Sequence, residues 1–447
     1  MVEFTKISVI GTWHLGSVYS ACLAELGYHV VGVDKDEQRI RNLNKGLAPI
    51  FEPGLNQLIA KNIGAGKLEY STDLQFAVRD TYFIFITYDT AVDDNDDIDL
   101  TELYKTINSL APILENGSIL IVSSQVPVGT CDAFEKIISD QNPQLDFDIA
   151  YVPENLRLGQ AISRFMNAER IVIGANRTLT LNAVEELFHN IGTIKVKMDL
   201  KSAEMTKHAL NAFLATSISF INEIANISDQ LGVDALKVAE AIKLDSRIGP
   251  NAMLKPGLGF SGGTLARDVK VLNKLGIGNS YSTELLNAVL RVNQQQNQIV
   301  IKKLEGIYGS ISNITVSVFG LTYKAGTSTL RRSVSLEIIH TLSVKGAKIK
   351  AYDPHADPKE IKNTQLFDMF DSPLSAAENS DALIFITEWP EFRKLDFSYI
   401  KSTMKHPVVI DAQNMLDGEF LTQMGFVYCG IGRGNKMTKL TVNSEVK

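Results

Sequence analysis

The sequence predicts an α/β protein with two Rossmann-like, doubly wound domains, joined by a long central helix and a helical dimerisation domain. A strand, a glycine-containing turn, a helix and a second strand follow one another over residues 6–34. The same succession returns over residues 314–354. Between them, residues 202–232 carry apolar side chains at helical spacing without a proline. Strand–helix–strand units build parallel sheets, and so long an amphipathic helix indicates an interface.

The first strand–helix–strand unit opens the chain. Residues 6–10 (KISVI) are expected to form a buried strand, residues 15–27 a helix closed by Gly27, and residues 28–34 (YHVVGVD) a second strand. Further apolar strands are expected at 82–87, 118–123 and 170–174. Their alternation with helical patterns predicts a doubly wound domain over residues 1–198.

The remainder of the chain divides into a helical middle and a second doubly wound domain. The helical part is expected over residues 199–300 and the second sheet over residues 301–447. Its expected elements are a strand from about residue 314, a helix at 334–344, a strand at 347–354, and strands at 382–387 and 407–410. Asp353 ends the second strand of this unit much as Asp34 ends that of the first.

Composition limits the class of function. The chain has 447 residues, a net charge of −7 and no basic surface signature, which argues against nucleic acid or an anionic membrane as partner. No apolar stretch approaches the roughly 20 residues of a membrane helix, and the N-terminus lacks a signal-peptide pattern. The three cysteines stand far apart without a metal-ligand spacing, so we expect no metal site. A cytoplasmic location is therefore expected.

The first glycine turn, SVIGTWHLGS, departs from the dinucleotide-binding fingerprint, because Trp13 occupies the place of its middle glycine. Gly11 can still make the tight turn, Gly16 can let the helix pack closely, and Asp34 can accept hydrogen bonds from an adenosine ribose. An acid at that position favours NAD over NADP. A purely structural turn without a ligand is the alternative reading, since the helix amides that hold an anion do not depend on one side chain.

Ten further segments resemble one family. They are GLAPIFEPGL (46–55), VPVGT (126–130), VPENLRLGQAI (152–162), AEMTKHALNAFLATSISFINEIA (203–225), LDSRIG (244–249), GLGFSGG (257–263), GLTYKAGT (320–327), YDP (352–354), TEWPEF (387–392) and DAQN (411–414). In this order they closely resemble the UDP-glucose/GDP-mannose dehydrogenase family, whose members use NAD to oxidise the C6 alcohol of a nucleotide sugar to a carboxylate. The resemblance implies an NAD-binding first half, a homodimer through the central helix, and a second half that binds the nucleotide of a UDP-sugar.

The resemblance also implies site residues. Catalysis falls to Lys207 and Asn211, four residues apart on the long helix, to Asp268 and to Glu154. The last two could instead cap helices. The implied cofactor-binding residues are Gly11, Trp13, His14, Leu15, Gly16, Asp34, Lys35, Thr90, Gln125 and Glu154. The implied substrate-binding residues are Leu156, Arg157, Lys207, Asn211, Arg247, Leu254, Gly259, Phe260, Lys324, Arg331 and Gln413. For Arg247, an intersubunit salt bridge is an equal alternative.

One departure from the family touches its chemistry. Family members carry a cysteine that attacks the C6 aldehyde and becomes a thioester, and an ungapped alignment puts Thr264 at that position. A threonine hydroxyl ionises far above neutral pH and is a poor substitute nucleophile. Cys131 follows VPVGT at an expected helix start, where the helix dipole would lower its thiol pKa, but nothing places it near the sugar. Asp89 also departs, since it stands where the family usually has glycine.

Three functions follow from this combination. The leading one is NAD-dependent oxidation of a nucleotide sugar, of the UDP-glucose or UDP-N-acetylhexosamine class, with the thioester step altered; water activated at Asp268 and Lys207 could then complete acid formation. A second is a two-electron dehydrogenase that stops at an aldehyde or ketone. A third is a non-catalytic nucleotide-sugar binding protein, which the retained Lys207, Asn211 and Asp268 argue against.

Overall fold

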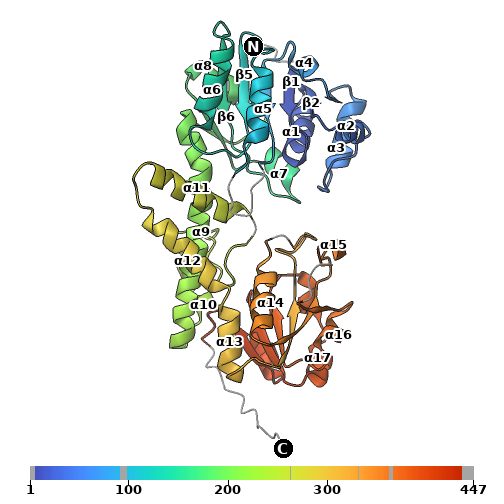
Figure 1. Ribbon diagram of the computed structural model, residues 1–447, viewed down its shortest axis with the longest axis vertical. Coiled ribbons are helices and arrows are strands. Elements are labelled where there is room, and N and C mark those ends of the chain that lie inside the picture. Colours follow the sequence, from blue (N-terminus) through green and yellow to red (C-terminus); the bar gives the residue numbers. More distant parts are fainter. Residues whose placement is uncertain (1–5, 91–97, 262, 331, 362–365, 435–447) are drawn as a thin grey trace, which may run out of the picture. The chain divides into compact units, whose positions relative to one another are not determined.

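The computed structural model describes residues 6–90, 98–261, 263–330, 332–361 and 366–434 (Figure 1). The chain forms two compact units, residues 1–209 and 210–447. Helix α9 (Leu200–Leu231) begins in the first unit and continues in the second. Each unit contains one sheet flanked by helices, so the predicted fold class is confirmed. The three-domain division at residues 198 and 300 stays a prediction.

The first unit holds an eight-stranded sheet with the order β3-β2-β1-β4-β5-β6-β7-β8. Its strands are β1 (Lys6–Ile10), β2 (His29–Val33), β3 (Leu68–Ser71), β4 (Phe83–Ile86), β5 (Ser118–Val122), β6 (Phe147–Tyr151), β7 (Arg170–Ala175) and β8 (Ile194–Met198). Its helices are α1 (His14–Glu25), α2 (Glu37–Leu43), α3 (Leu55–Gly64), α4 (Leu74–Val78), α5 (Thr101–Leu110), α6 (Thr130–Gln141), α7 (Ala161–Met166) and α8 (Thr178–Leu187).

Strand β4 explains why this sheet needs helices on both faces. All four of its residues are buried. Phe83 and Phe85 pack into the cluster that contains α1 residues, whereas Ile84 and Ile86 pack into the cluster that contains α5 and α6 residues. Because successive side chains of a strand point to opposite faces, an uninterrupted apolar strand must be covered on both sides.

Two strands of the first sheet, β7 and β8, do not follow the expected parallel arrangement. β7 pairs antiparallel with β6, and β8 then runs parallel to β7. The connection from β6 to β7 contains only the six-residue helix α7, about 9 Å long. β7 begins beyond the C-terminal end of β6 and runs back along it, with Tyr151 opposite Gly174 and Ala150 opposite Ala175.

The second unit combines helices with a six-stranded, all-parallel sheet of order β11-β10-β9-β12-β13-β14. Its strands are β9 (Thr315–Phe319), β10 (Lys348–Tyr352), β11 (Asp368–Met369), β12 (Ala382–Phe385), β13 (Val408–Asp411) and β14 (Val427–Gly430). Its helices after α9 are α10 (Ala235–Lys243), α11 (Thr264–Gly278), α12 (Glu284–Gln296), α13 (Ile299–Tyr308), α14 (Val334–Val344), α15 (Pro358–Ile361), α16 (Pro373–Ala377), the 3₁₀ helix Pro390–Lys394, α17 (Phe397–Thr403) and α18 (Gly418–Gln423).

Helix α9 spans 32 residues, Leu200–Leu231, close to the helix expected over residues 202–232. Across the described ranges, no helix is both long enough and apolar enough to cross a membrane.

Candidate cofactor and active site

The glycine turn after β1 has the backbone geometry of a dinucleotide-binding turn. Gly11 adopts a φ of +88°, and its N–H donates to the Val33 carbonyl at 2.9 Å. A Cβ at Gly16 would lie 1.8 Å from the Gly11 carbonyl oxygen, so only glycine fits there. The Thr87 hydroxyl at the end of β4 lies 2.9 Å from both the Ile10 and the Gly11 carbonyl oxygens. The turn is therefore fixed from both neighbouring strands.

Trp13 lies at the N-cap of α1 and contributes no side-chain cap. Its side chain is 44 % exposed. Trp13 lines a pocket of about 260 Å³ together with four polar residues in and beside α2 and two apolar ones, namely Asp36, Gln38, Arg39, Asn42, Leu47 and Pro49. The large side chain at the middle position thus lies beside α2.

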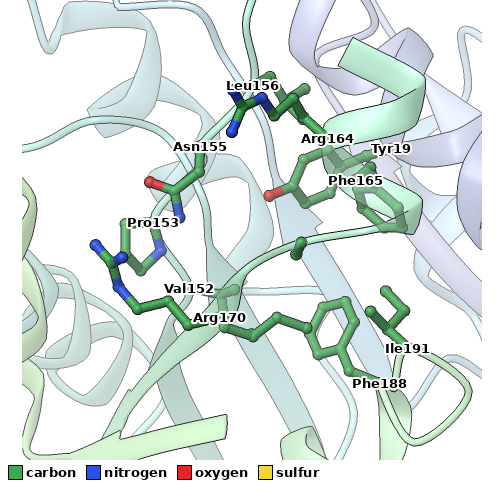
Figure 2. A pocket seen from close by; sticks show the side chains of 12 residues that line it. Tyr19, Val152, Pro153, Asn155, Leu156, Arg164, Phe165, Arg170, Phe188 and Ile191 are labelled. Carbon is green, nitrogen blue, oxygen red and sulfur yellow. The ribbon is translucent and has the colours of Figure 1, made fainter. Parts of the chain in front are cut away.

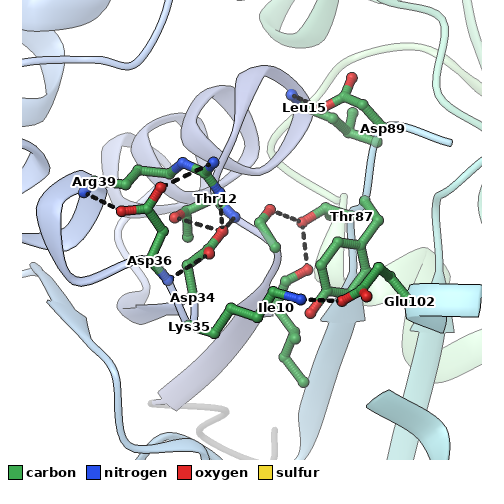
Figure 3. Close-up of polar contacts among 12 residues, drawn as sticks. Ile10, Thr12, Leu15, Asp34, Lys35, Asp36, Arg39, Thr87, Asp89 and Glu102 are labelled. Carbon is green, nitrogen blue, oxygen red and sulfur yellow. Dashed lines mark hydrogen bonds and ion pairs between the residues drawn. The ribbon is translucent and has the colours of Figure 1, made fainter. Parts of the chain in front are cut away.

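Asp34 closes β2 and is bound back onto the glycine turn (Figure 3). Its Oδ2 accepts from the Thr12 N–H at 2.8 Å and from Arg39 Nη1 at 2.6 Å. Among the described residues, its Oδ1 accepts only from the Asp36 N–H, at 3.1 Å. A carboxylate oxygen accepts two hydrogen bonds, so Oδ1 retains capacity for a ribose hydroxyl. The next residue, Lys35, is exposed and pairs with Glu102.

The first residues of α1 are held by two carboxylates that the sequence does not connect with them. His14 Nε2 lies 3.2 Å from Glu52 Oε2. The buried Glu52 also accepts from the Gly159 and Ala161 amides at the start of α7, both at 2.8 Å. The Leu15 N–H donates to Asp89 Oδ2 at 3.2 Å (Figure 3). The α1 N-terminus is therefore an anion-binding position, and it already contacts a carboxylate of this chain.

Of the remaining implied cofactor residues, two lie together. The Thr90 hydroxyl donates to the carbonyl of the buried Gln125 at 3.1 Å. With Gly11, Gly16 and Asp34, the βαβ turn has the shape and acceptor that a dinucleotide needs, so the residues present fit NAD.

Lys207 is buried on α9 and reaches Glu154. Its Nζ donates to the Glu154 carbonyl at 2.6 Å and lies 3.1 Å from Glu154 Oε1. The other carboxylate oxygen of Glu154 accepts from the Leu156 N–H at 2.8 Å. No helix begins at Glu154, since α7 starts only at Ala161, so the helix-capping alternative does not apply. The pair forms a fixed ammonium–carboxylate contact in the first unit.

Two neighbours of Lys207 anchor the start of α9. The buried Glu204 accepts from the amides of Gly129 at 2.5 Å and Cys131 at 2.9 Å, which lie at the start of α6. His208 Nε2 lies 2.8 Å from the Val126 carbonyl oxygen. The register of α9 against this unit, and with it the position of Lys207, is fixed on both sides.

Asn211, one turn after Lys207 on α9, contacts Asp268. Its amide donates to Asp268 Oδ2, and Arg267 Nε lies 3.6 Å from Asp268 Oδ1. Asp268 is fully buried and lies inside α11, which begins at Thr264. Capping of α11 therefore does not explain Asp268.

Thr264 is the exposed first residue of α11. All three cysteines are buried, and burial raises the pKa of Cys22, Cys131 and Cys429. The expected lowering of the Cys131 pKa by the helix dipole is wrong: after burial, the carboxylate of Glu204 raises it further. None of the three thiols is therefore a ready thiolate.

The loop of residues 257–260 is tied to the second unit's sheet and helices. The Leu258 N–H donates to the Ala412 carbonyl at 3.1 Å, just after β13. Asn293 accepts from the Phe260 N–H at 2.7 Å and returns a hydrogen bond to its carbonyl at 3.0 Å. A Cβ at Gly259 would lie 2.1 Å from the Asn293 side-chain oxygen, so this close approach needs glycine. The Gln413 amide binds the Ile386 carbonyl at 2.9 Å.

The other implied substrate residues belong to both units. Lys324 is exposed, with its Nζ 5.5 Å from the centre of the Tyr323 ring. Arg247 is exposed and pairs with Asp245 at 2.7 Å. Leu254 is buried, Leu156 is half-buried and Arg157 is exposed. Arg331 lies outside the described residues.

A small cavity of about 40 Å³ adjoins the segment that carries Glu154 (Figure 2). Its lining is mostly apolar and includes Tyr19, Pro153, Leu156, Phe165 and Phe188. A cavity of this size holds about one water and not a nucleotide sugar. Within the described part of the chain, no group of three or more His, Cys, Asp or Glu residues could hold a metal ion.

Comparison with known proteins covers nearly the whole chain. The NAD-binding, central and UDP-binding domains of the UDP-glucose/GDP-mannose dehydrogenase family match residues 5–192, 201–295 and 317–418. The UDP-glucose 6-dehydrogenase TuaD of Bacillus subtilis is 38 % identical over 96 % of this chain and 93 % of its own.

Two solved structures extend this likeness to the fold. A UDP-glucose dehydrogenase from Pyrobaculum islandicum is 28 % identical, with a TM-score of 0.83 over 96 % of this chain and 98 % of the other. A UDP-D-ManNAc dehydrogenase from Pyrococcus horikoshii is 25 % identical, with the same TM-score over 96 % of this chain and 100 % of the other.

Proposed function

The chain belongs to the UDP-glucose/GDP-mannose dehydrogenase family, and from this premise we propose that it oxidises the C6 alcohol of a UDP-sugar with NAD and stops at the aldehyde. The observation that carries the oxidation is the pair of contacts one helical turn apart on α9, Lys207 with Glu154 and Asn211 with Asp268. UDP-glucose is the first candidate substrate and the UDP-N-acetylhexosamines are the second.

The four residues divide the work of alcohol oxidation. NAD⁺, when bound, accepts the hydride from C6. The Lys207 ammonium stabilises the alkoxide that develops on the C6 oxygen, and Glu154 accepts the hydroxyl proton. Asn211 orients the oxygen through its amide, and Asp268 fixes that amide by accepting from it. The Glu154 contacts hold the ammonium ready, so little reorganisation is needed when charge forms.

The second unit binds the nucleotide part of the substrate in this proposal. Lys324 supplies positive charge, and the glycine-containing loop at 257–260 brings backbone close to the ligand. The contacts between Asn293 and Phe260 give that loop a fixed shape. These roles rest on the family's UDP-binding domain, which matches residues 317–418, and on its central domain.

The second oxidation, from aldehyde to carboxylate, lacks the nucleophile with which the family begins it. An aldehyde can yield a second hydride only after a nucleophile has added to its carbonyl carbon. Thr264 is a weak nucleophile, and the three cysteines are buried with raised pKa values. Water activated at Asp268 is disfavoured as well, because that carboxylate is fully buried and engaged with Asn211 and Arg267. We therefore expect one hydride transfer per sugar.

The amount of NADH formed from limiting UDP-glucose with excess NAD⁺, measured in parallel with and without semicarbazide, tests this proposal. The reaction without semicarbazide shows whether a second hydride follows, because the trap itself removes the aldehyde. We expect one NADH per sugar for the natural chain. Thr264→Cys restores a thiol that can hold the aldehyde, so its ratio should rise above one. A ratio of two without the cysteine would mean that water completes the oxidation. If UDP-sugars bind but none of them yields NADH, the protein is a nucleotide-sugar binding protein and not a dehydrogenase.

A homodimer is part of the proposed function. Phe213, Phe220 and Ile227 follow at seven-residue intervals along α9 and are 67 %, 49 % and 49 % exposed. Residues seven apart share one helix face, and an apolar stripe of this kind is the seam of helix–helix association. We assign this stripe to contact with a second copy of the chain.

A further inference from the structure

The carboxylate of Asp89 contacts a backbone amide at the start of α1, the part of a βαβ turn that would bind the pyrophosphate of a dinucleotide. In a βαβ turn, the first amides of the helix that follows the glycine turn bind that anion. Here the Leu15 N–H, the second amide of α1, donates to Asp89 Oδ2 at 3.2 Å (Figure 3). Trp13, the N-cap residue, gives α1 no side-chain cap, and the first turn of α1 holds no acidic residue. Asp89 supplies that negative charge from another strand's end.

The position of Asp89 is built into the turn. Thr87 binds the Ile10 and Gly11 carbonyl oxygens, and the Tyr88 ring lies so close to Gly11 that a Cβ there would be 2.9 Å from it. The Tyr88 hydroxyl in turn accepts from the Thr106 hydroxyl at 3.0 Å. Thr87 and Tyr88, the two residues before Asp89, are therefore held in place by these contacts. They position the Asp89 carboxylate at the start of α1.

The surroundings of Asp89 bear charge of both signs. Desolvation against α1, followed by the nearby charge of Glu154, raises the pKa of its carboxyl, while the Leu15 and His14 amides and the charge of His14 oppose that rise. The His14 ring is itself engaged with Glu52 at 3.2 Å. No other carboxylate in the described part of the chain accepts from the Leu15 N–H.

We propose that Asp89 is an internal competitor for the pyrophosphate-binding amides of α1 and sets the affinity of this chain for NAD. Two anions cannot share these amides, so the cofactor must displace the carboxylate when it binds. The same contact stabilises the cofactor-free protein, because a negative charge at a helix N-terminus is favourable. Asp89 thus lowers the affinity for NAD and raises the stability of the cofactor-free protein.

Calorimetric titration of NAD⁺ into the full-length chain, with thermal melts before NAD⁺ is added, tests this inference. Asp89→Asn should bind NAD⁺ about tenfold more tightly, the scale of a charge at a helix terminus, and should melt at a lower temperature without it. Asp89→Gly, which removes the side chain altogether, should do the same. Unchanged or weaker NAD⁺ binding by both variants would overturn the proposal.

Two controls separate competition from a general loss of structure. Asp73 caps α4 in the same unit by accepting from the Phe76 N–H at 3.0 Å, so Asp73→Asn should lower the melting temperature without tightening NAD⁺ binding. Adenosine, which carries no phosphate, should gain nothing from Asp89→Asn, and an equal gain would contradict competition for the pyrophosphate. The inference rests on the cofactor part of the proposed function, but no sugar is oxidised in these titrations. Failure of sugar oxidation would therefore leave their result untouched.

Discussion

At the scale of single residues, the acid that follows the second strand of each βαβ unit has a structural role, because it accepts hydrogen bonds from the turn after the first strand. Asp34 accepts from Thr12 and Asp353 accepts from Thr322 in the same way, through the backbone amide and the hydroxyl. Asp353 Oδ2 also accepts from the Leu321 N–H and the Trp389 indole. Each acid ties its glycine turn to the neighbouring strand, so the acid alone does not distinguish a cofactor-binding turn from a structural one.

Lys207 is the residue whose removal should cost most activity. Lys207→Met removes the ammonium that stabilises the alkoxide, so we expect NADH formation to fall by about 10²–10³ while NAD⁺ binding is retained. Steady-state rates with UDP-glucose check this. Lys201→Met is the matched control, because Lys201 lies on the same helix but pairs with Asp132 at the surface, and its rate should not change. Equal losses in both variants would contradict a catalytic role.

The sequence names most residues of the candidate site, yet it does not predict their partners. Motif spacing indicates Gly11, Gly16 and Asp34, and the family resemblance indicates Lys207, Asn211 and Asp268. The carboxylates of Asp89, Glu52 and Glu204 bind amides 74, 107 and 75 residues away. Such pairs depend on how strands and helices pack, and no local pattern marks them.

At the scale of elements, the buried Glu204 joins α9 to α6 and should make stability depend on pH. Burial, the largest influence, raises the Glu204 pKa, although the Cys131 and Gly129 amides oppose it. The folded state therefore holds this proton more tightly than the unfolded chain. The stability that this proton contributes to the folded state is complete below the unfolded pKa of about 4.3. It is lost as pH rises through the higher folded pKa of Glu204.

Unfolding by urea at pH 4 and pH 7 measures this effect. The free energy of unfolding of the natural chain should fall relative to Glu204→Gln between these values, by about 1.4 kcal/mol per unit of pKa shift. Glu25 on α1 is the control of opposite sign, because its hydrogen bond from Lys61 lowers its pKa. Relative to Glu25→Gln, the natural chain should gain stability over the same range. A Glu204 effect in the same direction as Glu25 would contradict the account.

Element positions follow from sequence wherever apolar periodicity is strong. The helix expected at 334–344 is α14 (Val334–Val344), and the strand expected at 6–10 is β1. Short or partly exposed strands such as β3, β8 and β11 lack that signal. The direction of β7 also lies beyond it, because apolar periodicity indicates a strand but not the direction in which it pairs.

At the scale of the whole molecule, the stripe on α9 predicts an assembly. Phe220→Asp puts a charge in the middle of the stripe, so the chain should become monomeric in light scattering or sedimentation while remaining folded. Leu179, 73 % exposed on α8, is the matched control, and Leu179→Asp should leave the oligomeric state unchanged. If the Phe220→Asp chain stays dimeric, the dimer interface does not lie on this stripe of α9.

The whole chain keeps the family's three domains, and the proposed change in its chemistry concerns one position, Thr264. The three domains match the family's models and Lys207 contacts Glu154, and we propose that Thr264 stands in place of the thiol that would hold the aldehyde. Fold and family are predicted from the sequence because many ordered motifs support them. In the proposed function, the number of electrons removed per sugar depends on one residue, and it must be measured.

The most direct measurement is the amount of NADH formed per molecule of limiting UDP-glucose with excess NAD⁺, in parallel reactions with and without semicarbazide. The account predicts one NADH per sugar, with the C6 aldehyde recovered as its semicarbazone. Two NADH per sugar, with the carboxylate as product, would contradict it.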